Sequence, residues 1–246
     1  MAKVITSLQN PLVKEWVKLR ESKSFRQERG ECLISGAKQI AETPSPKLLL
    51  VYRTSLIPKN YSGQIVRVSQ EVLQKATGLK NPDGIAAVVP LPAPARFQKT
   101  RRLLALDGVA DPGNLGTLLR TALAFGWEGV FCLPGCADPF GDKALRAAKG
   151  ATFHIPIEDG PFARLLQIVE NSALLPLAAD ALGKPFKEID KSLPLVLILG
   201  AEGKGLSEKT QKIAQNIAIP MEGRVESLNV AVAGAILLYG LNDASA

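Results

Sequence analysis

The 246-residue sequence has few of the residues that build metal centres and disulfide frameworks. It contains one histidine, His154, and three cysteines, Cys32, Cys132 and Cys136. So few cysteines in a chain of this length do not form a disulfide framework, and one histidine leaves no His/Cys cluster for zinc. Neither His154 nor the Cys132/Cys136 pair has a nearby residue that would complete a nucleophile–base pair. We therefore expect no metal and assign these residues structural roles.

Long hydrophobic runs are also missing. The longest uncharged run, residues 227–242, has 16 residues and includes Asn229 and two glycines. It is shorter and more polar than a membrane span, so we interpret it as a core helix and expect no membrane segment. The opening residues, MAKVITSLQNPLVKEW, lack the basic, apolar, small-residue order of a signal peptide. These features predict a cytoplasmic protein.

Positive charge is concentrated in the first two fifths of the chain. Residues 1–101 contain 17 lysines and arginines against 7 acidic residues, a net charge of +10, whereas residues 102–246 contain 13 against 16, a net charge of −3. A basic surface attracts nucleic acid by neutralising phosphates and releasing their counterions. The alternative is a solvated basic face without a partner, and charge alone does not separate the two.

A proline-rich segment, residues 90–102 (PLPAPARFQKTRR), coincides with this change of charge. We expect an extended connector there and divide the chain into residues 1–90, a linker at 91–101 and residues 102–246. Before the linker, short β-rich runs alternate with helical stretches, which predicts a small α/β domain. The strands expected there are residues 31–36, 47–53, 64–69 and 84–89, and the helices are residues 10–22 and 69–78.

The second part of the chain predicts a parallel sheet with helices on both faces. Most of its apolar runs do not alternate with polar residues, as is typical of strands covered on both sides. The expected strands are residues 102–109, 129–134, 175–180, 193–200 and 216–221, and the expected helices are Asn114–Phe125, Asp142–Lys149, Pro161–Asn171, Ser207–Ala214 and Ser227–Leu241. Ligands of such sheets bind beyond the carboxyl ends of the strands. We expect three glycine-bearing turns, residues 106–116, 197–207 and 219–229, to line one crevice.

The helix that begins at Asn114 carries Arg120 on the side away from its apolar residues. A cation near the positive end of a helix is unfavourable unless an anion meets it. Arg120 is therefore either an ordinary exposed arginine or a group that faces an anionic ligand. Glu202, in a glycine turn directly after the apolar run LVLIL, is a carboxylate that can pair with Arg120; its alternative is a solvent-facing loop position.

The turn around Glu202 does not carry a nucleotide-binding fingerprint. Residues 200–205 read GAEGKG, which matches neither G-x-G-x-x-G nor G-x-x-x-x-G-K-[ST]. An NAD- or nucleotide-dependent α/β enzyme is an alternative function, but the sequence carries neither of the glycine fingerprints expected of such an enzyme.

The last expected helix, Ser227–Leu241, is apolar nearly all round, which predicts that it is buried. Ser227 is a candidate N-cap at its start. Asn229 would lie two residues further, as a buried amide whose partners come from a polar ligand or from the preceding loop.

The segments DPGNLGTLLRTALAFG, LILGAEGKGLS and IPMEGRVESLNVAVAGAILLY, in this order and spacing, resemble the three signature motifs of the SpoU (TrmH) family. This family consists of RNA ribose 2′-O-methyltransferases of the SPOUT superfamily. The similarity covers nearly all of residues 102–241. The preceding residues look like the substrate-binding domain of many members, a ribosomal-protein-like α/β RNA-binding fold. The resemblance also implies a deep trefoil knot near the C-terminus, an exception to the unknotted rule.

The resemblance assigns roles residue by residue. The motif residues of the active site fall on Asn114, Arg120, Glu202, Ser227 and Asn229. The cofactor-binding positions, mostly backbone groups of the knotted loops, fall on Leu199, Gly200, Ile219, Met221 and Leu228. The implied cofactor is S-adenosylmethionine. The implied assembly is a homodimer in which the apolar helices of the knot form the interface and the partner often completes the site, and the Ser227–Leu241 helix has the apolar surface for such an interface.

The reaction implied by the resemblance transfers a methyl group to a ribose 2′-hydroxyl of RNA. The type of N-terminal domain favours ribosomal RNA over transfer RNA. Arginine, with a pKa of about 12.5–13.8, is a poor base, so we expect Arg120 to stabilise the emerging alkoxide and to hold a phosphate, with Glu202 orienting it. The alternatives are the same reaction on transfer RNA and a non-catalytic RNA-binding protein on this scaffold.

Overall fold

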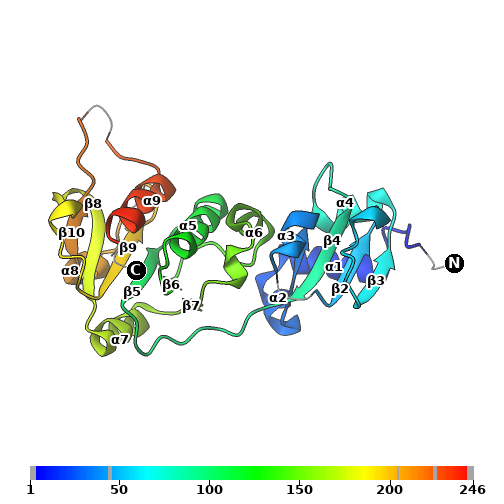
Figure 1. The fold of residues 1–246 in the computed structure, drawn as a ribbon, viewed down its shortest axis with the longest axis horizontal. Helices are drawn as coiled ribbons and strands as arrows, with labels where there is room; N and C mark the ends of the chain where they lie inside the picture. Colours follow the sequence, from blue (N-terminus) through cyan, green and yellow to red (C-terminus); the bar gives the residue numbers. More distant parts are fainter. Residues whose placement is uncertain (1–3, 44–45, 204, 224–225, 243–246) are drawn as a thin grey trace.

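The structure of the protein is a computed structural model that describes residues 4–43, 46–203, 205–223 and 226–242. The chain forms two sheets, and Figure 1 shows them at opposite ends of an elongated molecule. A four-stranded sheet has the order β1-β4-β2-β3, and a six-stranded sheet has the order β10-β8-β9-β5-β6-β7. Within the described ranges, no helix is both long and apolar enough to cross a membrane.

The four-stranded sheet mixes antiparallel and parallel pairs, since β1 and β2 run antiparallel to β4 while β3 runs parallel to β2. Its elements are α1 (Pro11–Glu21), α2 (Lys23–Arg29), β1 (Glu31–Ser35), α3 (Ala37–Ala41), β2 (Leu48–Val51), β3 (Gln64–Arg67), α4 (Gln70–Thr77) and β4 (Ile85–Pro90). The two expected helices form where caps are available. Asn10 accepts a hydrogen bond from the Leu12 N–H at the start of α1, and Ser69 caps α4. The short helices α2 and α3 were not predicted.

The six-stranded sheet is parallel throughout, as predicted. Its elements are β5 (Arg102–Asp107), α5 (Pro112–Ala124), β6 (Gly129–Cys132), α6 (Asp142–Ala148), β7 (Ile157–Asp159), α7 (Phe162–Ser172), β8 (Leu175–Pro185), β9 (Leu195–Gly200), α8 (Glu208–Ile213), β10 (Gln215–Ala218) and α9 (Val230–Gly240). The edge strand β7 was not predicted, because its three residues include two acids. Strand β8 is longer than expected, and its pairing with β10 skips residues 179–183.

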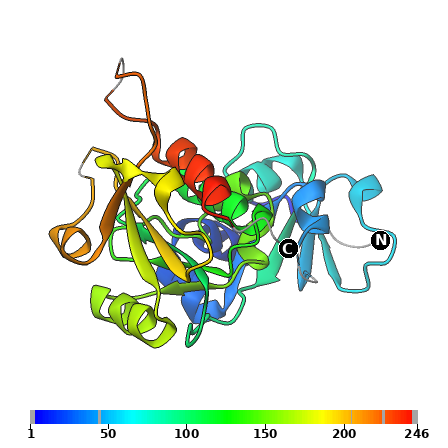
Figure 2. The same cartoon turned by 60° about the vertical axis from the view of Figure 1, so that its left-hand side comes forward.

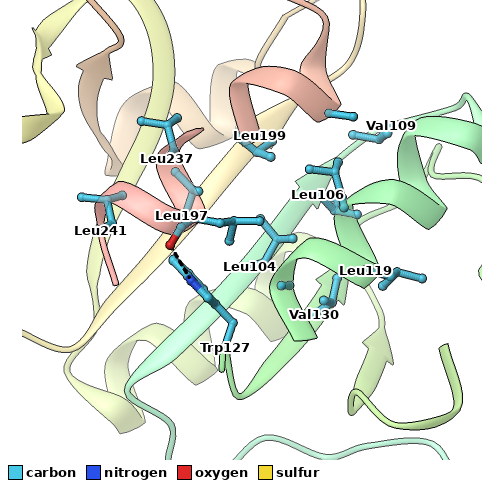
Figure 3. Close-up of a cluster of buried hydrophobic side chains, with 14 of the residues drawn as sticks. Leu104, Leu106, Val109, Leu119, Trp127, Val130, Leu197, Leu199, Leu237 and Leu241 are labelled. Atoms are coloured by element: carbon cyan, nitrogen blue, oxygen red, sulfur yellow. Dashed lines mark hydrogen bonds between the residues drawn. The ribbon is translucent and has the colours of Figure 1, made fainter. Parts of the chain in front are cut away.

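Alternate residues of the central strands pack into two separate cores. Leu104 and Leu106 of β5 join a cluster with α5 and α9, whereas Leu103 and Ala105 pack against α7. Figure 2 shows α7 and α9 on opposite sides of the sheet. In the first core the indole N–H of Trp127 donates to the Leu238 carbonyl at 3.1 Å, as drawn in Figure 3. Strands covered on both faces explain why their sequences are continuously apolar.

Residues 91–101 contain no helix or strand, but they do not form a free tether. The Ala95 N–H donates to the Ile157 carbonyl at 3.1 Å, and the Phe97 N–H donates to the Glu158 carboxylate at 2.8 Å. Phe97 itself is buried. The segment therefore lies along β7 and is fixed to the six-stranded sheet.

The two sheets also share packing. Leu145 of α6 and Phe153 belong to one cluster with Cys32, Ile34 and other residues of the four-stranded sheet. The Gln39 amide donates to the Leu145 carbonyl at 2.9 Å. The two parts of the chain are therefore held together by an apolar contact with a buried hydrogen bond inside it.

Helix α9 differs from its prediction in two ways. It begins at Val230, and Asn229 rather than Ser227 is its N-cap. It is also not buried all round. Val232, Ile236 and Tyr239 are 50%, 37% and 70% exposed. These three residues, one and two turns apart, form an apolar face that this single chain leaves uncovered. We call it the α9 face.

Candidate active site

A cavity of about 610 Å³ opens beyond the carboxyl end of β9. Three segments line it: the middle of β8 around Asp180, the loop that follows β9, and Ile219, Met221 and residues 227–229 before α9. This is the position that an open parallel sheet offers to a ligand. Two of the three glycine-bearing turns expected to share a crevice line this cavity, and the third reaches it through Asn114.

The turn after β9 needs glycine at the last residue of the strand, Gly200. Ala201 and Gly205 exchange backbone hydrogen bonds of 3.0 and 2.9 Å, so the chain turns back sharply. A Cβ at Gly200 would lie 2.5 Å from the backbone carbonyl carbon of Gly205. Any other residue at this position would force the turn open, because the atom in the way is backbone.

All five residues expected to bind a cofactor line this cavity: Leu199, Gly200, Ile219, Met221 and Leu228. Their contribution is mainly apolar side chain and backbone. Met221 is 36% exposed at the rim. Ser227 lines the cavity too and is exposed, with Asn229 two residues further as the helix cap.

Glu202 lies between the starts of two helices. Its Oε1 accepts hydrogen bonds from the Asn114 amide at 2.5 Å and from the Asn229 amide at 2.9 Å. The Asn229 amide also donates to the Asn114 Oδ1 at 3.2 Å. Asn114 is in the first turn of α5 and Asn229 caps α9. A carboxylate is favoured there because both helix N-termini are positive. We call these three residues the Glu202 cluster.

The side chain of Asn229 is therefore used differently from the expectation. It is exposed, and its Oδ1 accepts from the Ala231 and Val232 N–H groups at 2.9 and 3.3 Å. Its amide joins the Glu202 cluster, so its protein partners come from α5 and the loop after β9 and not from the loop that precedes it.

The expected ion pair between Arg120 and Glu202 is not formed. Arg120 is exposed on α5, six residues beyond Asn114, which is about 9 Å along a helix. Within the described part of the chain, no hydrogen bond or ion pair holds its guanidinium. The structure thus brings together four of the five predicted active-site residues, Asn114, Glu202, Ser227 and Asn229. It leaves Arg120 outside the cavity.

Two aspartates that sequence reasoning missed support the same loops. Asp107, the last residue of β5, accepts from the Ser207 N–H at 2.9 Å and from the Thr210 hydroxyl at 2.7 Å. Asp180 lines the cavity and accepts from the Leu182 N–H at 2.8 Å and the Asn216 amide at 3.3 Å. The signal was present in the sequence, because each aspartate directly follows a run of apolar residues in a strand of the parallel sheet.

The thiols of Cys132, at the end of β6, and Cys136, in the loop after it, differ in chemistry. A hydrogen bond with Cys132 lowers the pKa of Cys136, whereas the same bond together with burial raises the pKa of Cys132. The Cys136 thiol contacts the Leu106 carbonyl at 3.2 Å.

Elsewhere, His154 makes a 2.7 Å hydrogen bond with the Glu42 carbonyl. Among the described residues, no group of three or more His, Cys, Asp or Glu side chains is arranged to hold a metal ion.

Many ligand-binding α/β enzymes have a parallel sheet with a cavity at the carboxyl ends of its strands. In this protein a glycine turn shapes the cavity, and a carboxylate lies between the capped starts of two helices. The comparisons with known proteins give the family. The model of the SpoU rRNA Methylase family matches residues 101–239. That of the MRM3-like substrate binding domain matches residues 10–87. The chain belongs to the SpoU family and is an RNA methyltransferase.

Three relatives place it more closely. The 23S rRNA (guanosine(2553)-2′-O)-methyltransferase RlmP of Bacillus subtilis is 37% identical, over 97% of this chain and 99% of its own length. The AdoMet-bound rRNA methyltransferase of Sinorhizobium meliloti has a TM-score of 0.84 at 30% identity, covering 98% of this chain and 97% of its own. The TrmH/SpoU tRNA modifying enzyme of A. aeolicus has a TM-score of 0.50 at 26% identity, covering 59% of this chain and 76% of its own.

Proposed function

We propose that this protein transfers a methyl group from S-adenosylmethionine to a ribose 2′-hydroxyl of ribosomal RNA. The observation that carries the proposal is the position of the Glu202 cluster at the mouth of the cavity beyond β9. The similarity to RlmP over nearly the whole of both chains supports the 2′-O and ribosomal assignments.

The cavity fits this cofactor. Its volume of about 610 Å³ lies within the range of ligand sites, about 300–1,000 Å³. The absence of a Cβ at Gly200 lets the following turn fold back against the strand, so that backbone groups of Gly200, Gly203 and Gly205 form part of the cavity wall. Leu199, Gly200, Ile219, Met221 and Leu228 would hold it by backbone and apolar contacts. When bound, S-adenosylmethionine supplies an electrophilic methyl group.

The residues around the cavity have separable roles. The Glu202 cluster fixes the starts of α5 and α9 relative to each other, so that the hydroxyl of a substrate is held in place above the cavity. Positioning of this kind contributes about 7–11 kcal/mol in favourable cases. The hydroxyl of Ser227 is available to hydrogen-bond the ribose. Arg120 would stabilise charge on the attacking oxygen and hold the adjacent phosphate through its planar fork, while phosphate or water takes the proton.

A homodimer would explain how an arginine outside the cavity takes part. The α9 face is uncovered in this chain, and Tyr239 contacts Phe125 at the end of α5 with ring centroids 5.3 Å apart. The face therefore continues onto the helix that carries Arg120. We propose that two copies pair through the α9 face and that the Arg120 of one copy reaches the cavity of the other.

Ribosomal RNA is favoured over transfer RNA by the first part of the chain. Residues 10–87 match a substrate-binding domain, and the tRNA modifying enzyme covers only 59% of this chain, whereas the rRNA methyltransferases cover nearly all of it. We assign residues 1–90 to a ribosomal-protein-like RNA-binding domain, 91–101 to the linker and 102–246 to the methyltransferase domain. A trefoil knot in the last domain and a cytoplasmic location complete the proposal.

The experiment is methyl transfer from radiolabelled S-adenosylmethionine to transcribed 23S rRNA and to bulk transfer RNA, followed by mapping of 2′-O-methyl sites. We expect label in ribosomal RNA, resistant to alkaline cleavage at one nucleotide. Label in transfer RNA alone, or on a base, would overturn the specific assignment. No transfer, together with no heat on titration of S-adenosylmethionine, would favour a non-catalytic RNA-binding protein.

A further inference from the structure

Two surface hollows meet at Arg20, near the end of α1. One, of about 380 Å³, is lined by Arg20, Lys75, Gly78 and Lys80 among others. The other, of about 360 Å³, is lined by Arg20, Ala110, Pro112 and Lys143 among others. We call the two together the Arg20 groove. It begins on the four-stranded sheet's helix α4 and ends at the loop before α5.

Arg20 is a fixed part of the floor of this groove. Its guanidinium donates to the Lys75 carbonyl at 2.9 Å and to the Ala76 carbonyl at 3.3 Å, at the end of α4. A Cβ at Gly78 would lie 2.4 Å from its Nη1, so the glycine makes room for it. Arg20 also pairs with Glu21. A cation is favoured at the negative end of a helix, which explains why the guanidinium stays there.

The charge that remains available in the groove is positive. Each acidic residue that lines it is already paired: Glu21 with Arg20, Asp138 with Arg26, and Asp142 with Arg146. Lys75, Lys80 and Lys143 are exposed, and within the described ranges none of their ammonium groups has an ion pair or hydrogen bond. Three uncompensated cations, Lys75 and Lys80 in one hollow and Lys143 in the other, are a pattern that attracts a polyanion.

The groove also leads to the chemistry. Pro112 opens α5, and Asn114, two residues later, donates to Glu202. A strand lying in the groove would thus pass from α4 across Arg20 to the start of α5, beside the Glu202 cluster. We infer that the Arg20 groove holds the phosphate backbone of the RNA strand that enters the active site. The inference rests on the proposed function and adds the surface through which the substrate arrives.

The test compares two triple variants with the same change of charge. In K75A/K80A/K143A the groove loses its three free cations. In the control, K14A/K38A/K59A, three exposed lysines that line neither hollow are removed. Binding of a fluorescein-labelled oligouridylate of about 20 nucleotides is followed by anisotropy between about 50 and about 200 mM salt.

We expect the groove variant to bind the oligonucleotide about tenfold more weakly, with the slope of log K against log salt reduced by about 2, close to 0.7 for each phosphate that is no longer neutralised. The control variant should bind less than about threefold more weakly than the wild type. Equal losses of affinity in the two variants, or an unchanged slope in the groove variant, would overturn the inference, because then only overall charge matters or the lysines do not touch phosphate.

Two further readouts separate this inference from the proposed function. All three proteins should bind S-adenosylmethionine equally in calorimetry, and the groove variant should methylate 23S rRNA transcript with a raised KM and a near-normal kcat. A wild-type protein that binds the oligonucleotide through these lysines but methylates no RNA would refute the proposed function and leave the groove standing. A wild-type protein that methylates, with no difference between the two variants in KM or slope, would refute the groove alone.

Discussion

The two parts of this protein differ in their net charge and in whether they contain the cavity. Residues 1–101 carry +10 and residues 102–246 carry −3, and the cavity with its glycine-turned loop lies wholly in the six-stranded part. The first part therefore offers charge for a polyanion, and the second offers shape for a small ligand. Under the proposed function, affinity for RNA would come mainly from the first part and the chemistry from the second, so the relative position of the two must be fixed for both to act on one RNA.

Substitution of Arg120 tests whether the chemistry is confined to the six-stranded part. It should have the largest effect on the rate of methyl transfer. We expect Arg120→Ala to lower kcat by about 10²–10³-fold, because a positioned donor to developing charge is lost. Calorimetry should show unchanged binding of S-adenosylmethionine, since the variant keeps every residue that lines the cavity. Arg120→Lys should recover only part of the rate, because lysine lacks the planar fork. Near-normal turnover by the alanine variant would remove Arg120 from the mechanism.

The α9 face tests whether one copy of the six-stranded part is sufficient. Tyr239→Asp places a charge on an apolar surface that is 70% exposed, and we expect a monomer with about 10²-fold less methyl transfer. Light scattering at micromolar concentration and the transfer assay provide the readouts. Leu182→Asp is the matched control, because Leu182 is 95% exposed and belongs to β8 and not to the α9 face. A monomeric wild-type protein with full activity would contradict the dimer.

The buried ion pair between the two parts tests how firmly they are joined. Arg26 pairs with Asp138, and their side chains are only 4% and 16% exposed. Asp138→Asn keeps an acceptor for the Phe140 N–H but leaves the Arg26 charge unpaired, so we expect a loss of about 3 kcal/mol in the free energy of unfolding.

The control for this measurement is Asp159→Asn, which breaks the exposed pair with Lys23 at 3.5 Å and should cost less than about 1 kcal/mol. Denaturant melts of both variants give the values. Equal losses of stability in the two would mean that the Arg26–Asp138 pair does not fix the parts more firmly than a surface contact. Deleting residues 1–95 is a poorer test, because it uncovers Leu145 and Phe153.

The thiols give the smallest effect and report on the loop after β6. Cys136 is half-buried and its pKa is lowered by Cys132, whereas burial raises the pKa of Cys32 to about 12. We expect one thiol per chain to react with a chromogenic disulfide at about pH 8, and Cys136→Ser to abolish the reaction. Reaction of two or three thiols in the native protein would show that the cores open more readily than the packing indicates.

Sequence patterns predicted elements that carry their own signals. The parallel strands were evident from continuous apolar runs, and α5 from the Asp-Pro-Gly-Asn opening, where Asp111 caps the Asn114 N–H at 2.7 Å. Helices α2 and α3 and strand β7 were missed because they have 7, 5 and 3 residues, too few to show a period.

The sequence predicted which loops form the site, but not which of their side chains form hydrogen bonds with one another. The cavity-lining positions came from the family resemblance, and the packing places them together. The Glu202 cluster could not be read from the sequence, because a carboxylate between two amides and a carboxylate beside an arginine give the same motif. The exposed side of α9 was predicted to be core for a similar reason. An apolar sequence predicts that a surface is buried. It does not predict whether the same chain or a second copy of it covers that surface.

The contact of Leu145 and Phe153 with Cys32 and Ile34 has a consequence for how such proteins can diversify. A recognition module joined only by a tether could be exchanged between enzymes at will. In this protein the four-stranded part packs against α6, so a domain that replaced it would need a surface complementary to α6. Changes in target choice should therefore arise by substitution within the existing pair of cores, and chimaeras cut at the proline-rich segment should fail unless the α6 surface is redesigned as well.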